Sequence, residues 1–212
     1  MRRTVLLTGF GPFPGVRRNA SDVLARRLAE SARRRYPGTT FVHATLPTEW
    51  IGAPLRLEEL TMTHRPDIAL HFGVSHQAEG FVIETSARNV AEKADAVGTH
   101  PMANELVPNQ PTVRQTKLPA ARVVNRLRRI GLPACVSHDA GAYLCNAIFF
   151  HSLRLNDLVN PDAQSAFIHL PAALANRNKP MSQPEAVRGG LEIIATVLKH
   201  PPAMLPSYQA VA

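Results

Sequence analysis

The chain has few cysteines, few aromatic side chains and no long hydrophobic run. Its 212 residues include only two cysteines, Cys135 and Cys145, and 6% aromatic residues. Two cysteines without metal-site spacing exclude a disulfide framework and favour a reducing compartment. No segment approaches the ~18 consecutive apolar residues of a membrane-spanning helix, and no small-residue cleavage site follows the short apolar run near the N-terminus. We therefore expect a cytoplasmic protein that has no membrane partner.

Acidic residues are also scarce relative to basic ones. The chain has 16 Asp and Glu against 24 Lys and Arg, which gives a net charge of +8. Such a balance is typical of nucleic-acid-binding proteins. The longest basic run, residues 33–35, falls at the expected end of a helix, where cations complement the helix dipole. Because no zinc-finger or RNA-binding motif accompanies the charge, a nucleic acid is not expected as the main partner. A basic nucleic-acid-binding domain remains the alternative.

Hydrophobic periodicity predicts strands that alternate with helices. The expected strands are residues 4–8, 40–46, 68–74, 81–86, 134–137 and 165–170. The expected helices are residues 21–35, 49–64, 120–130 and 182–199, with one more that carries Cys145. Residues 89–118 lack periodicity, which is typical of a lid or binding loop. The pattern predicts a single-domain α/β/α sandwich over residues 1–212, with a twisted, largely parallel central sheet and a loose tail over residues 201–212.

Cys145 has two interpretations on local grounds. It follows the turn at residues 139–141 and begins an apolar helix in the segment SHDAGAYLCNAIFFHSL. A free cysteine usually packs as a small hydrophobe. At a helix N-terminus, however, the dipole favours the thiolate, and exposed N–H groups can stabilise an oxyanion. These residues alone leave a structural cysteine and a nucleophile both open.

Two further residues are candidates for chemistry. His169 lies near a strand end, and Glu84 lies inside an apolar strand, where a carboxylate needs a partner. Either can instead be structural, as a satisfied strand-end histidine and a solvent-facing edge residue. Ligands of parallel sheets bind at the carboxyl ends of strands, where we expect both residues and the turn before Cys145. A cysteine, a histidine and a carboxylate placed in this way suggest a cysteine hydrolase. The other histidines show no metal-site spacing and there is no GxGxxG motif, so we expect no metal or organic cofactor.

Four segments share a pattern with one family. They are LLTGFGPFPGVRRNAS, FGV followed by VIETSARN, SHDAGAYLCN, and AFIHLP. Together and in this order they resemble pyroglutamyl peptidase I (pyrrolidone-carboxylate peptidase), a family of cysteine peptidases. The resemblance covers about residues 4–172.

The resemblance implies a triad of Cys145, His169 and Glu84. Cys145 would attack the carbonyl carbon of an N-terminal pyroglutamyl residue, and His169 would take the thiol proton and later protonate the leaving amine. Glu84 would orient His169, as the acid does in other triads. Water would then hydrolyse the thioester. The implied substrates are peptides with N-terminal pyroglutamate, and the implied assembly is a homo-oligomer, commonly a tetramer in this family.

The same resemblance implies the substrate-binding residues. Phe10 and Phe13 match the family positions that hold the pyroglutamyl ring, and Asn19 matches a support for their loop. The remaining positions carried over to the substrate pocket are Val74, Tyr143 and Leu144.

Two departures from the family pattern bear on activity. Val74 stands where many relatives have a glutamine, so a donor to the lactam is missing or is replaced by Ser75 or His76. Lys93 stands near the place of a loop arginine that is often credited with stabilising the site, and either it takes that role or nothing does. A divergent, weakly active or inactive homologue that acts as a binding protein is therefore a further alternative.

Overall fold

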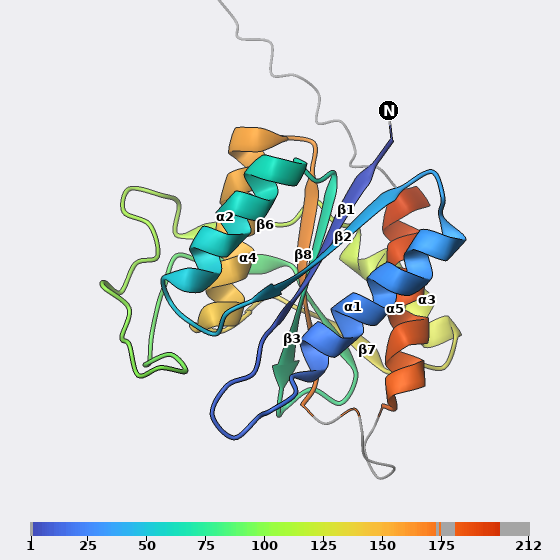
Figure 1. Cartoon of the computed structure of the whole chain (residues 1–212), viewed down its shortest axis with the longest axis horizontal. Helices are drawn as coiled ribbons and strands as arrows, with labels where there is room; N and C mark the ends of the chain where they lie inside the picture. Colours follow the sequence, from blue (N-terminus) through green and yellow to red (C-terminus); the bar gives the residue numbers. More distant parts are fainter. Residues whose placement is uncertain (1, 173, 175–180, 200–212) are drawn as a thin grey trace, which may run out of the picture.

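A six-stranded sheet runs through the centre of the molecule (Figure 1). The computed structural model describes residues 2–172, 174 and 181–199, so the expected tail over residues 201–212 lies outside the described residues. The strands of this sheet, in spatial order, are β2 (Thr40–Leu46), β1 (Thr4–Phe10), β3 (Ile68–Ser75), β8 (Gln164–Pro171), β4 (Phe81–Glu84) and β7 (Ala134–Ser137). Every pairing is parallel except that of β4 with β8. The predicted α/β fold with a largely parallel sheet is confirmed.

Helices cover both faces of the sheet. Figure 1 shows α2 (Gly52–His64) and α4 (Leu144–Val159) on one face. The opposite face carries α1 (Ala20–Arg35), α3 (Ala120–Arg129) and α5 (Gln183–Lys199). A second, two-stranded antiparallel sheet consists of β5 (Ser86–Arg88) and β6 (Val113–Gln115). Among the described helices, none combines the length and the apolar character needed to cross a membrane.

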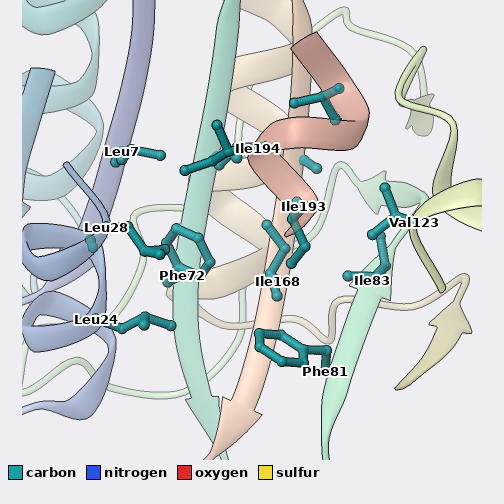
Figure 2. Packing of buried hydrophobic residues seen from close by; sticks show 14 of the residues in the cluster. Leu7, Leu24, Leu28, Phe72, Phe81, Ile83, Val123, Ile168, Ile193 and Ile194 are labelled. Atoms are coloured by element: carbon teal, nitrogen blue, oxygen red, sulfur yellow. The ribbon is translucent and has the colours of Figure 1, made fainter. Parts of the chain in front are cut away.

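The sheet separates two hydrophobic cores. Leu7 and Phe72 point toward α1 and α5, where Figure 2 shows them with Leu28 and Ile194. On the other face, a second cluster under α2 and α4 contains Phe167. Successive side chains of a strand point to opposite faces, so apolar residues throughout β1, β3 and β8 fill both cores.

Two local predictions need correction. The expected strand over residues 81–86 is interrupted at Thr85, because β4 ends at Glu84 and β5 begins the small sheet at Ser86. The partner of β5 is β6, which lies inside the segment expected to lack structure, residues 89–118. Three-residue strands are too short to show an alternating pattern, so periodicity alone does not reveal them.

The direction of β4 also differs from the expectation that Glu84 lies at the same sheet edge as the other strand ends. β4 is antiparallel to β8, with Val82 opposite His169 and Glu84 opposite Phe167. The connection from β3 to β4, residues 76–80, is too short for the crossover of a dozen or more residues that a parallel return needs. The strand therefore returns antiparallel, and Glu84 lies beside the middle of β8.

Candidate active site

Glu84 and His169 form a buried pair across the antiparallel strands. They are diagonal neighbours on one face of the sheet, a position from which long side chains meet. Nδ1 of His169 donates to Oε1 of Glu84 at 2.8 Å, and the two side chains are 12% and 2% exposed. The side chain of Cys145 hydrogen-bonds to His169 from the start of α4. The structure thus brings together the three residues predicted to be catalytic.

The environment of His169 favours its charged form. Burial alone would lower the pKa of His169, but its hydrogen bonds to Cys145 and Glu84, together with their negative charge, raise it to about 10. Oε2 of Glu84 is buried and has no hydrogen-bond partner among the described residues. The imidazolium therefore compensates for the burial of this carboxylate. The pair holds a cation beside Cys145 at neutral pH.

The start of α4 exposes backbone donors next to Cys145. Gly141 adopts a left-handed φ of +86°, and its N–H donates to Oδ1 of Asp139 at 3.0 Å, which turns the chain toward the helix. Tyr143 precedes the helix in an extended conformation, and its side chain does not cap it. α4, which is described in full, also has no acidic residue in its first turn. Its first N–H groups are therefore placed to bind a developing negative charge.

Gly73 allows the close approach of Cys145 to the sheet. It is the register partner of His169 on the neighbouring strand. A Cβ at Gly73 would lie 3.1 Å from Sγ of Cys145 and 2.6 Å from Cζ of Phe167. Any larger residue would displace the thiol or the ring beneath it, so glycine is required by space here.

A small, mainly apolar pocket of about 160 Å³ opens beside Cys145. All six residues expected to bind the substrate contribute to its wall. Within the described part of the chain, its lining is Phe10, Phe13, Asn19, Thr48, Val74, Ala96, Tyr143, Leu144 and Cys145. Ser75, His76 and Lys93, which were considered as substitutes for missing polar groups, are not among these lining residues.

Asn19 holds the loop after β1, which carries Phe13, against α1. Its Oδ1 accepts from the N–H of Ser21 at 3.1 Å, and its Nδ2 donates to the carbonyl of Gly11 at 3.2 Å. Oγ of Ser21 accepts from the N–H of Phe10 at 3.0 Å. The helix was expected to begin at residue 21, whereas α1 begins at Ala20 with Asn19 as its N-cap residue. The same amide therefore begins the helix and fixes the loop that leads to Phe13.

Sequence reasoning missed the small residues Thr48 and Ala96 in the pocket wall. Asp95 organises this part: its carboxylate accepts from the backbone N–H of Trp50 at 2.9 Å and of Thr99 at 2.8 Å. Burial raises the pKa of Asp95, but these backbone donors outweigh it and lower the pKa below its usual value. The sequence signal for this part of the wall was an acidic residue, Asp95, within the expected binding loop. Nothing in the sequence marked Thr48 or Ala96 as pocket residues.

Asn146 joins the nucleophile helix to the segment that follows β5. It is fully buried, and its Oδ1 accepts from the N–H of Arg88 at 2.8 Å. Its Nδ2 donates to the carbonyls of Arg88 at 2.8 Å and Val90 at 3.1 Å. Because Glu84 lies on the strand just before this segment, the amide sets the spacing between the Cys145 side and the Glu84 side of the site.

A second buried histidine lies next to the site. His71 makes two hydrogen bonds of 2.8 Å, through Nδ1 with Thr8 and through Nε2 with Ser152, one ring nitrogen donating and the other accepting, and burial lowers its pKa to about 3. Its hydrogen-bond partners are hydroxyl groups, and Oγ of Ser152 donates onward to Oγ of Ser165. Within the described residues, no cluster of three or more histidine, cysteine or acidic side chains could hold a metal ion.

Comparisons with known proteins identify the family. The family model for pyroglutamyl peptidase matches residues 3–191. Pyrrolidone-carboxylate peptidase 1 of Ralstonia nicotianae is 33% identical, over 92% of this chain and 93% of the relative. Pyrrolidone-carboxylate peptidase of Bacillus amyloliquefaciens is 32% identical, over 81% and 79%. The crystal structure of pyroglutamyl peptidase I from Bacillus amyloliquefaciens superposes with a TM-score of 0.85 at 28% identity, covering 94% of this chain and 97% of that one. The chain therefore belongs to the pyroglutamyl peptidase family.

Proposed function

We propose that the protein is a cysteine exopeptidase that hydrolyses the amide bond after an N-terminal pyroglutamyl residue of peptides. The observation that carries this proposal is the hydrogen-bonded set of Cys145, His169 and Glu84 at the edge of a small apolar pocket. The names of the relatives, pyrrolidone-carboxylate peptidases, support the same substrate class.

In the proposed reaction, the Cys145 thiolate attacks the pyroglutamyl carbonyl carbon, and the new S–C bond gives a tetrahedral intermediate. First-turn N–H groups of α4 bind its oxyanion. His169 donates a proton to the leaving amine as the C–N bond breaks, which leaves a thioester. His169 then takes a proton from water as the water oxygen attacks the thioester carbon; the S–C bond breaks, pyroglutamic acid leaves, and the Cys145 thiolate and His169 imidazolium are restored. Glu84 stabilises the imidazolium throughout.

The proposed selectivity comes from the size and polarity of the pocket. A lactam ring is flat and uncharged, so Phe10 and Phe13 can bury its faces. A free N-terminal ammonium would lose its hydration there without a charged partner, which disfavours ordinary peptide N-termini. Val74 offers no hydrogen bond, so the lactam N–H and C=O must bind backbone groups or another polar residue of the pocket wall, such as Thr48. This makes selectivity depend more on shape and on the absence of charge than on side-chain recognition.

We also propose a homo-oligomeric, cytoplasmic enzyme that works as one peptidase domain without a cofactor. Exposed apolar side chains at α2, Ile51 at 59% and Leu55 at 61%, offer a surface that a second copy can cover. Both cysteines are free thiols, as is usual in a reducing compartment. Sedimentation would test the assembly, and a tetramer is the expected result.

The test of the function is cleavage of a pyroglutamyl-coumarin amide by the pure protein. We expect turnover that Cys145→Ala abolishes and that Cys135→Ser, at the exposed thiol, leaves unchanged. Iodoacetamide should inactivate the wild type while labelling Cys145. Turnover that persists in Cys145→Ala would refute the nucleophile, and no turnover by the folded wild type would favour the inactive binding homologue.

A further inference from the structure

Arg88, the last residue of β5, contacts the chain on both sides of Cys145. Its backbone N–H donates to Oδ1 of Asn146 at 2.8 Å, and its carbonyl accepts from Nδ2 of the same amide at 2.8 Å. Its guanidinium reaches the turn that precedes α4, where Nη2 lies 3.1 Å from Oδ1 of Asp139 and 3.4 Å from the carbonyl oxygen of Gly141. One residue of a neighbouring strand is thus bonded to the nucleophile segment before and after Cys145.

The carboxylate of Asp139 links the guanidinium to the backbone of the turn. Its Oδ1 accepts from the N–H of Gly141 at 3.0 Å in addition to its contact with Arg88. Hydrogen bonds between charged groups are shorter and stronger than neutral ones, so the cation orients the carboxylate more firmly than water does. Arg88 therefore holds the turn at residues 139–141 in two ways, through this carboxylate and through the carbonyl of Gly141.

The direction of this turn decides where the first N–H groups of α4 point. Cys145 is the second residue of α4 and lies four positions after Gly141. Between them, the carbonyl of Ala142 accepts from the N–H of Glu92 at 2.8 Å, which is a further bond from the segment that follows β5. Oxyanion donors act at hydrogen-bond distances of about 3 Å, so a small shift of the turn weakens them.

Stability alone does not account for the Arg88–Asp139 pair. The two side chains are 44% and 62% exposed, and ion pairs this exposed contribute little to the free energy of unfolding. Arg56 and Glu59 on α2 form a pair of nearly equal exposure, 42% and 64%, but they join positions one helical turn apart. Arg88 and Asp139 instead lie 51 residues apart and connect two segments at the active site.

We propose that Arg88 is a positioning residue for the oxyanion-binding donors of α4. This inference rests on the function proposed above, because it gives Arg88 a part in stabilising the tetrahedral intermediate. The guanidinium acts through Asp139 and Gly141 and does not touch the substrate. Its removal leaves binding of the lactam ring unchanged and weakens contacts made in the transition state, so kcat and kcat/KM fall together.

The first test is Arg88→Met, which keeps an unbranched apolar side chain and removes the guanidinium. We expect kcat for the pyroglutamyl-coumarin amide to fall about tenfold at unchanged KM, a partial effect beside the roughly 10²–10³-fold loss of a whole oxyanion donor. Arg88→Lys keeps the charge without the planar fork and should recover part of the rate. The matched control, Arg56→Met, should keep the wild-type kcat, and both methionine variants should unfold at similar urea concentrations.

The aldehyde analogue of pyroglutamate gives a second readout. The sulfur of Cys145 adds to the aldehyde carbon, and the oxygen of the resulting tetrahedral adduct lies where the oxyanion forms. Arg88→Met should raise the inhibition constant of this aldehyde about tenfold, in step with the loss of kcat/KM. The inhibition constant of 2-pyrrolidone, which contains the lactam ring and no carbonyl outside it, should not change.

Hydrogen exchange of residues 139–146, followed by mass spectrometry, tests the positioning without turnover. Exchange should be faster in Arg88→Met than in the wild type and in Arg56→Met. The inference is overturned by a kcat within about twofold of the wild type, by a rise in KM at unchanged kcat, or by unchanged exchange. A wild type without turnover would refute the proposed function, and the exchange rates would then decide whether Arg88 positions this segment.

Discussion

His71 and His169 lie on neighbouring strands, on the same face of the sheet and two register positions apart, yet they differ in charge. His71 is opposite Phe167, and His169 is opposite Gly73. The pKa of His71 is lowered to about 3, whereas that of His169 is raised to about 10. His71 is fully buried and His169 is largely buried, so the difference lies in their partners.

Burial by itself favours the neutral imidazole, and His71 shows that result. Its partners, Thr8 and Ser152, are hydroxyl groups that can donate or accept and so satisfy a neutral ring. His169 instead contacts the carboxylate of Glu84 and the sulfur of Cys145, whose negative charges reverse the effect of burial. A buried histidine in this fold is therefore structural or suited to chemistry according to the charge of its partners and not to its depth.

The largest expected effect comes from removing each histidine in turn. His169→Ala should lower kcat about 10⁴-fold, the scale seen when a triad member is lost. His71→Gln should leave kcat per folded molecule nearly unchanged, because His71 contacts hydroxyl groups and not the reacting atoms. Reporter cleavage measures kcat for both variants. Circular dichroism gives the folded fraction to which the rates are normalised. Similar losses in the two variants would contradict the comparison.

The next effect comes from removing the charge of Glu84 while keeping its shape. Glu84→Gln should lower kcat about 10³-fold and reduce the pKa of His169, because an amide cannot stabilise the imidazolium as a carboxylate does. In the wild type, activity should fall as pH rises through about 10, where His169 loses its proton. This alkaline limb should move to lower pH in the variant. An unmoved limb would mean that Glu84 does not set the charge of His169.

Much of the fold could be predicted from the sequence because strong periodicity marks its long elements. The strand over Thr40–Leu46 and the strand over Ala134–Ser137 have the predicted bounds. The reversed direction of β4 was missed because strand and helix alternation suggested a uniform sheet. The short connection over residues 76–80 carried the contrary signal, since it cannot hold a crossover.

The candidate site could be anticipated as a set of residues but not as a geometry. Cys145, His169 and Glu84 were predicted from residue type and family resemblance, and their contacts depend on the diagonal pairing of β4 with β8. The positioning role of Asn146 could not be predicted from the sequence, because a polar residue at the start of a helix is common. Its role follows only from the fold, which brings a distant backbone segment to its amide.

A smaller effect should distinguish Asn146, which positions the residues around His169, from Asn89, a second buried asparagine that serves as its control. Asn146→Ala should lower kcat about 100-fold, because a small displacement of reacting groups is costly. Asn89 provides the matched control: its amide also bridges backbone, donating to the carbonyl of Val107 at 2.8 Å and accepting from its N–H at 2.9 Å. Asn89→Ala removes a similar bridge, which ties the same segment to Val107 and not to α4, and should change kcat far less at equal loss of stability. Equal losses of kcat would make Asn146 merely structural.

The smallest expected effect is a pH dependence of stability that belongs to His71. Its folded pKa, about 3, lies below the ordinary histidine value of 6.5, so its contribution to stability is present above pH 6.5 and is lost as pH falls toward 3. Between pH 7 and 5 the unfolded state gains protons at this position, which lowers the free energy of unfolding by about 2 kcal/mol. Urea denaturation at both pH values should show a drop that is smaller by this amount in His71→Gln. His151, whose burial also lowers its pKa, to about 4, gives a parallel loss that persists in this variant, so the difference between the two proteins isolates His71. An identical drop in both would mean that His71 is not held neutral, and its contrast with His169 would disappear.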